Sequence, residues 1–154
     1  MYERILVPLD GSQVSESALP HLENLVSKFT PETKVEVTLL QVLSLVQPSY
    51  VEGAAGPNIA YTQKQIERSK KKAIDYLNKT GESLRNRGVA VSARVAFGDA
   101  AEEIVKAAEE VDADLIAMST HGRSGISRWA FGSVADKVLR LEERIPILMI
   151  RVKK

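Results

Sequence analysis

The residues best suited to chemistry lie in one stretch, residues 119–133, which is rich in glycine and cations. Gly122 and Gly132 have nine residues between them, and Ser133 opens a segment with helical periodicity. A glycine permits close backbone approach, and the free amides of a helix N-terminus attract anions. Cationic side chains of the same stretch favour a polyphosphate: His121, Arg123 and Arg128. The spacing therefore predicts a phosphate-binding loop that runs into a helix.

A purely structural interpretation of this stretch stays open. Ser133 is followed three positions later by Asp136, which resembles a capping box, and glycines punctuate loops of every kind. The stretch contains neither the Gly-x-x-x-x-Gly-Lys-Ser/Thr of P-loops nor the Gly-x-Gly-x-x-Gly of dinucleotide-binding folds. The spacing excludes those two nucleotide folds but leaves phosphate binding and simple helix capping as alternatives.

Asp10 is a second candidate for ligand binding, because it ends a short apolar run and precedes Gly11 and Ser12. Its carboxylate can accept from sugar hydroxyls or help to hold Mg²⁺, whereas its structural role would be an Asx turn. Asp10 can bind a ligand and form the Asx turn at the same time. Pro8 and Leu9 stand beside it at the same predicted strand end.

Other kinds of chemistry find no support in the sequence. The chain has no cysteine, which excludes a disulfide framework, a thiolate zinc site and a cysteine nucleophile. The histidines, His21 and His121, do not lie beside a nucleophile elbow, and no residue is an evident general base. We therefore assign no catalytic residue, and an enzymatic role stays uncertain.

Composition indicates one globular domain over residues 1–154, since 44% of the residues are hydrophobic and 27% are charged. The formal net charge of +1 gives no general attraction to nucleic acid. The first residues lack the basic start of a signal peptide, and no segment approaches the roughly 20 apolar residues that cross a bilayer. We expect a soluble cytoplasmic protein.

The elements that must position these residues alternate between strand and helix. Apolar, β-branched runs predict strands over residues 4–10, 34–46, 89–97, 114–118 and 146–152. Helical spacing predicts helices over residues 13–28, 59–87, 100–110 and 133–143. Residues 47–58 contain prolines and glycines and are predicted to be a mobile loop.

This alternation predicts an α/β fold, a doubly wound sandwich with a five-stranded, mostly parallel sheet and four flanking helices. Such sheets bind ligands beyond the carboxyl ends of their strands, where the strand order reverses. The carboxyl ends concerned hold Asp10, Val42 and Met118, with the glycine-containing loop directly after them.

The loop resembles the signature of ATP-binding universal stress proteins. That signature begins with a small residue, followed after two residues of any type by a glycine. After nine more residues of any type come a second glycine and a serine or threonine. The matching positions here are Ser119, Gly122, Gly132 and Ser133. The resemblance extends from residues 5–12 through Gly98 and Asp99 to residues 146–152. It implies a Rossmann-like fold of the adenine nucleotide alpha hydrolase type.

The resemblance also implies a ligand and its contacts. The ligand would be ATP, or ADP or AMP, with Mg²⁺ or Mn²⁺, its adenine near Val42 and its ribose near Asp10. The phosphates would lie on Gly122, Gly132, Ser133 and Val134. The remaining expected contacts are Pro8, Leu9, Met118, Ser119, His121 and Arg123. Many ATP-binding members have glycine where this chain has Ser119, so we expect the Cβ of Ser119 to crowd the ribose or the phosphates.

The implied function is that of a dimeric, nucleotide-dependent regulator in the stress response, with a homodimer formed through the strand at residues 147–152 and an unidentified protein partner. Neither nucleic acid nor membrane is an expected partner. Two alternatives stay open: a slow ATPase or other ATP-using enzyme, and a dimeric interaction module without nucleotide.

Overall fold

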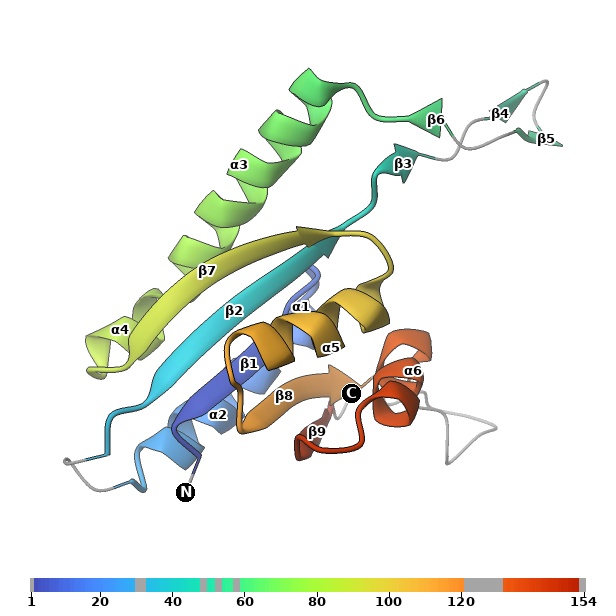
Figure 1. Ribbon diagram of the computed structural model, residues 1–154. Helices are drawn as coiled ribbons and strands as arrows, with labels where there is room; N and C mark the ends of the chain where they lie inside the picture. The colour runs from blue at the N-terminus through green and yellow to red at the C-terminus, as the bar shows by residue number, and fades with distance from the viewer. Residues whose placement is uncertain are drawn as a thin grey trace.

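A five-stranded parallel sheet forms the centre of the molecule (Figure 1). The computed structural model describes residues 2–29, 33–47, 50–51, 54–56, 59–120 and 132–152. The strands are β1 (Arg4–Pro8), β2 (Glu36–Leu43), β7 (Ala90–Phe97), β8 (Leu115–Thr120) and β9 (Ile147–Arg151). They lie in the order β7-β2-β1-β8-β9, and every neighbouring pair is parallel. The predicted five-stranded parallel sheet is confirmed.

Helices cover both faces of this sheet. On one face pack α1 (Gln13–Glu16), α2 (Ala18–Val26), α3 (Gln63–Thr80) and α4 (Glu82–Asn86). On the other pack α5 (Ala100–Glu110) and α6 (Ser133–Leu141), which lie in front of the sheet in Figure 1. The predicted doubly wound α/β architecture is therefore confirmed.

Two apolar cores fill the spaces between the sheet and its helices. In β1, Ile5 and Val7 belong to the core beneath α1 to α4, whereas Leu6 belongs to the core beneath α5 and α6. All three are at most 1% exposed, because successive strand residues point to opposite faces and both faces are covered. This explains why β1 is apolar without interruption from Ile5 to Val7 instead of alternating.

The first predicted helix, residues 13–28, is interrupted at Ser17. Ser12 caps α1 by accepting from the amide of Ser15, and α1 ends after one turn. Pro20, in the first turn of α2, has no N–H to donate to the carbonyl of Glu16, so the helical ladder cannot continue through this point. At this interruption the hydroxyl of Ser17 donates to the carbonyl of Val14 at 2.6 Å.

The second predicted helix, residues 59–87, starts later and is interrupted. Thr62 and Gln65 form a capping box that sets the start of α3 at Gln63. At the other end the buried Gly81 separates α3 from α4, and Gly88, with a φ of +84°, follows α4. Ile59 and Ala60 form the short strand β6 (Ile59–Ala60), not helix.

Short antiparallel pairs lie at the predicted loop between β2 and α3. β3 (Val46–Gln47) pairs with β6, and β4 (Tyr50–Val51) pairs with β5 (Ala54–Ala55). In Figure 1 they extend beyond the end of the main sheet. The mobility predicted for residues 47–58 stays a prediction.

The C-terminal half follows the prediction with small shifts. Asp99 caps α5 by accepting from the amide of Glu102, and α5 has the predicted bounds. β8 continues to Thr120, so Ser119 lies in the strand and not in the following loop. Within the described ranges, no helix has the length and apolar character needed to cross a membrane.

Candidate functional site

The strand order reverses between β1 and β8. From β1 the chain proceeds outward through β2 to β7, whereas β8 and β9 lie on the other side of β1. Open α/β sheets bind ligands in the crevice that this reversal creates. A cavity of about 300 Å³ lies here, within the size range of small-molecule sites.

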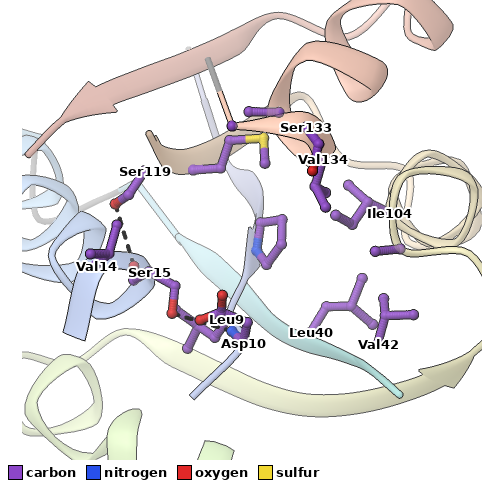
Figure 2. Close-up of a pocket in the computed structure, with 15 residues that line it drawn as sticks. Leu9, Asp10, Val14, Ser15, Leu40, Val42, Ile104, Ser119, Ser133 and Val134 are labelled. Atoms are coloured by element: carbon purple, nitrogen blue, oxygen red, sulfur yellow. Dashed lines mark hydrogen bonds between the residues drawn. The ribbon is translucent and has the colours of Figure 1, made fainter. Parts of the chain in front are cut away.

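The cavity has an apolar side. Figure 2 shows Leu40, Val42 and Ile104 together on one side of it, contributed by β2 and α5. Other apolar lining residues come from the neighbouring elements: Pro8, Leu9, Val14, Ala100, Met118, Val134 and Ala135. This side can receive an apolar ring and exclude water from it.

A second side consists of the N-terminus of α6. Gly132 is the N-cap, with a φ of −56° and a ψ of 155°, and it has no side chain that could accept from the first amides. Ser133, Val134 and Ala135 line the cavity with Gly132, so the positive end of the helix dipole meets it. This arrangement suits an anion.

The capping-box alternative for Ser133 is wrong. Ser133 is the first helical residue, not the cap, and no side-chain hydrogen bond caps α6 among the described residues. Asp136 pairs with Arg140 one turn later, at 2.9 Å from its Nη2. The carboxylate of Asp136 therefore pairs along the helix, and among the described residues no side chain accepts from the first amides of α6.

A third side carries hydroxyl and carboxylate groups. Figure 2 shows Ser15 and Ser119 across the cavity from Val42 and Ile104, with Asp10 beside Leu9 between the two sides. The amide of Ser12 donates to Oδ1 of Asp10 at 2.9 Å, which is the predicted Asx turn, and the amide of Asp10 donates to Oγ of Ser15 at 3.2 Å.

Asp10 is ionised at neutral pH. Burial raises the pKa of its carboxyl, but hydrogen bonds from Ser12 and Ser15 lower it by more, so the pKa lies below its ordinary value of 3.8. The carboxylate can accept hydrogen bonds from ligand hydroxyls or contribute one oxygen to a cation that another ligand holds.

Ser119 is tied to the protein through its hydroxyl. Its Oγ lies 3.0 Å from Oγ of Ser17 and 3.4 Å from the carbonyl oxygen of Ser15. The side chain therefore points toward the junction of α1 and α2, on the face of the sheet opposite to Met118, while the residue still lines the cavity.

The structure brings together every predicted site residue that it describes. Around the cavity lie Pro8, Leu9, Asp10, Val42, Met118, Ser119, Gly132, Ser133 and Val134. His121, Gly122 and Arg123 lie outside the described residues. Their assignment to the phosphates stays a prediction.

Sequence reasoning missed several lining residues: Val14, Ser15, Leu40, Ala100, Ile104 and Ala135. Leu40 and Val42 alternate on one face of β2, and Ala100 and Ile104 are one turn apart on α5 after the cap at Asp99. Their periodicity was visible in the sequence. Their proximity depends on α5 packing across β1 and β2, which periodicity does not encode.

The described residues contain no group of three or more His, Cys, Asp or Glu side chains that could hold a metal ion. Asp10 is the carboxylate on the described part of the cavity wall.

A doubly wound parallel sheet with a cavity at its switch point, and with a helix N-terminus in the cavity wall that no described side chain caps, defines the class of α/β proteins that bind ligands at the carboxyl edge of the sheet. The profile of the universal stress protein family matches residues 1–151. The chain belongs to this family.

Individual relatives agree with this assignment. Universal stress protein MJ0531 of Methanocaldococcus jannaschii is 30% identical over 154 residues, which are 100% of this chain and 85% of the relative. Universal stress protein MJ0577 of the same organism is 31% identical over 162 residues, covering 99% of this chain and 97% of the relative.

Solved structures agree as well. The structure of MJ0577 superposes with a TM-score of 0.72 at 25% identity and covers 100% of this chain and 99% of its own. The universal stress protein of Archaeoglobus fulgidus in complex with dAMP superposes with a TM-score of 0.61 at 22% identity, covering 97% and 98%. The latter similarity shows the shared fold.

Proposed function

We propose that this chain binds ATP, or ADP or AMP, in the switch-point cavity and acts as a dimeric, nucleotide-dependent regulator of the stress response. The observation that carries the proposal is the division of the cavity into three parts: an apolar side, a side with hydroxyl and carboxylate groups, and the N-terminus of α6, which no side chain caps among the described residues. An adenine nucleotide consists of a flat aromatic base, a sugar with hydroxyls and one or more anionic phosphates.

Each part of the nucleotide has a matching part of the cavity. The base would pack against Leu40, Val42 and Ile104. The ribose hydroxyls would donate to Asp10, and the phosphates would accept from amides at Ser133 and Val134. Gly122, with Arg123 and His121 beside it, would complete the phosphate contacts.

The same fold accommodates an adenine nucleotide in a relative, since the Archaeoglobus fulgidus protein was solved with dAMP. We propose that Mg²⁺ or Mn²⁺ enters together with the nucleotide, held mainly by phosphate oxygens and water, with Asp10 as the protein ligand. The cation would neutralise part of the phosphate charge.

The homodimer would form along β9. This strand pairs with β8 on one side and has no partner on its other edge among the described strands. The carbonyl of Pro146 accepts from Ile116 and the amide of Val152 donates to Thr120, so the even-numbered residues bond to β8. The odd-numbered residues, such as Ile147 and Met149, then direct their N–H and C=O groups toward the free edge, where a second copy can pair.

Exposed apolar side chains on α6, the helix that precedes β9 in the chain, would extend the same interface. Leu139 and Leu141 of α6 are 37% and 43% exposed. Because α6 carries both these leucines and the proposed phosphate site, nucleotide binding at its first turn would bear on the dimer contact at its last turn. Nucleotide binding would thus change the surface that α6 presents to the second subunit or to a protein partner.

The test is identification of nucleotide on the purified protein by mass spectrometry, followed by calorimetric titration with ATP and Mg²⁺. Gly132→Val adds a branched side chain to the cavity wall and should abolish binding; Lys106→Val, exposed on α5, is the control and should not. Binding of none of ATP, ADP and AMP at millimolar concentration would refute the proposal. Steady release of phosphate during the titration would indicate a slow ATPase instead of a pure regulator.

A further inference from the structure

Positive charge is concentrated on α3, and the proposed function does not use it. Six cationic and two acidic residues give this helix a net charge of +4, whereas the whole chain has +1, so the remaining residues together carry −3. The molecule as a whole does not attract an anionic partner, but α3 does. This charge asymmetry makes α3 a candidate interaction surface.

The helical period places most of these cations on one side of α3. Ala73 and Leu77 are buried and define the inner side of the helix. At 3.6 residues per turn, the outer side holds a set of exposed cations, here called the cationic face: Lys64, Arg68, Lys71, Lys72 and Lys79. Asp75 is the acidic residue on this side, so the face keeps an excess of positive charge.

The cationic face has no carboxylate partner in the described part of the chain. Each ion pair of that part uses a cation outside α3, as Lys137 does with Asp99. Lys64 and Arg68 are four positions apart, and so are Arg68 and Lys72, a spacing at which like charges destabilise a helix. The face therefore weakens α3, and its charges are available to an external anion.

Exposed aliphatic side chains lie next to the cationic face. Residues 45–47 and 59–61 pair through β3 and β6 and form an arm, whose second segment leads into the N-cap of α3. Leu45, Val46 and Ile59 of this arm are 44%, 40% and 50% exposed. Figure 1 shows the arm beyond the end of the main sheet, at the N-terminal end of α3. A cationic helix and an apolar arm are therefore neighbours on the surface.

An anionic lipid bilayer has the chemistry that both features require. Its headgroups form an extended anionic layer that attracts lysines, and apolar side chains can enter the boundary beneath the headgroups. The cationic face consists of lysines and one arginine, and lysine is a flexible point charge that suits a diffuse layer of anions. A nucleic-acid site would favour arginine forks and aromatic stacking platforms, and the cationic face contains no aromatic residue.

We propose that the cationic face and the arm form a peripheral binding surface for membranes that contain anionic lipids. Such a contact lies on the bilayer surface and needs no membrane-spanning helix. The expectation from the sequence that a membrane is no partner rests on the net charge of the whole chain and on the length of apolar runs. Neither property tests for a local surface of this kind. The proposal does not depend on nucleotide binding.

The test is co-sedimentation of the purified protein with vesicles of phosphatidylglycerol and phosphatidylcholine in equal parts, at low salt. Wild-type protein should bind these vesicles, lose binding as the salt concentration rises, and not bind phosphatidylcholine alone. A triple variant with Lys64→Gln, Arg68→Gln and Lys71→Gln should bind about fivefold more weakly for each cation removed. Glutamine is a good helix former, so α3 should stay intact, as circular dichroism can verify.

A matched triple variant controls for net charge. Lys28→Gln, Lys34→Gln and Lys106→Gln together remove the same charge at exposed positions outside α3 and should leave vesicle binding close to that of wild type. The arm is tested by Ile59→Ser, which should weaken binding about threefold to tenfold, the range for one partly inserted aliphatic side chain. Tyr2→Ser, at a residue that is 39% exposed near the start of β1, should not weaken it.

The proposal is overturned if wild-type protein does not bind the mixed vesicles, or if both triple variants lose binding equally. Duplex DNA and polyglutamate are the competing polyanions. If either binds the protein through the cationic face while the vesicles do not, the partner is a nucleic acid or an acidic protein and not a membrane. None of these results bears on the nucleotide site, which calorimetry tests separately.

Discussion

Nζ of Lys137 lies 3.0 Å from Oδ1 of Asp99, the residue that caps α5. The same ammonium group lies 3.0 Å from Oε1 of Glu102. Lys137 belongs to α6 and the two carboxylates to the start of α5, and both helices contribute to the wall of the candidate site. The ion pair therefore links the two elements proposed to bind the base and the phosphates, which pack against each other through the apolar core.

The first prediction concerns the pH dependence of this contact. The amide of Glu102 and the ammonium of Lys137 hold the pKa of the Asp99 carboxyl below its ordinary value of 3.8. A lowered pKa contributes stability that is present above pH 3.8 and is lost as the pH falls through the folded-state pKa. Asp99→Asn keeps a capping oxygen but removes the charge, so we expect wild type to be more stable than Asp99→Asn at pH 7.

That difference should shrink as the pH falls below the ordinary pKa of an aspartate. Urea unfolding of both proteins between pH 3 and pH 7 measures it, and Lys137→Met should reduce the pH dependence of wild type. A difference between the two proteins that does not change with pH would show that the charge of Asp99 contributes nothing.

The second prediction concerns Gly81, which lies between α3 and α4. A Cβ at this position would stand 2.9 Å from Cγ1 of Val91 and 3.1 Å from Cδ1 of Leu39. Gly81→Ala should therefore destabilise the fold by about 1–3 kcal/mol through overpacking, although alanine is the better helix former. Thermal unfolding is the measurement. If Gly81→Ala is as stable as wild type or more stable, the side chains of Val91 and Leu39 can shift without loss of folding free energy.

The third prediction concerns the hydrogen bond between α3 and α1. The hydroxyl of Tyr76 donates to Oε1 of Glu16 at 2.8 Å, and both side chains are half-buried. Burial, followed by this bond, raises the pKa of Tyr76. Tyr76→Phe should cost about 0.5–1.5 kcal/mol in the free energy of unfolding. Tyr2→Phe, at a residue that is 39% exposed, is the matched control and should have no measurable effect.

The fourth prediction tests the proposed dimer. Met149→Pro removes an N–H that points to the free edge of β9, whereas Met149→Val shortens the side chain and keeps the N–H. Sedimentation analysis should show a dimer for wild type and for Met149→Val and a monomer for Met149→Pro. A monomeric wild-type protein would refute the proposed dimer. A dimeric Met149→Pro protein would show that the dimer interface does not include the free edge of β9.

Much of the fold follows from local patterns. The apolar runs around Ile5 and Ile116 predict buried strands, and caps such as Ser12 and Asp99 mark helix starts, because these signals depend on neighbours within one or two turns. The interruption at Ser17 has a local signal too, the missing N–H at Pro20, which the helix prediction over residues 13–28 did not use. The interruption at Gly81 is less visible, because it depends on the close approach of Gly81 to Val91 and Leu39.

The sequence by itself determined the strand and helix alternation, the candidate loop that ends at Gly132 and the presence of Asp10 at a strand end. Only the tertiary structure decided that β1 and β8 are neighbours, that α5 closes the cavity and that the hydroxyl of Ser119 meets Ser17. The physical reason is the separation along the chain of the groups that interact. Periodicity and capping are local properties of the backbone, whereas strand order and the contact between the hydroxyls of Ser17 and Ser119 depend on groups about a hundred residues apart.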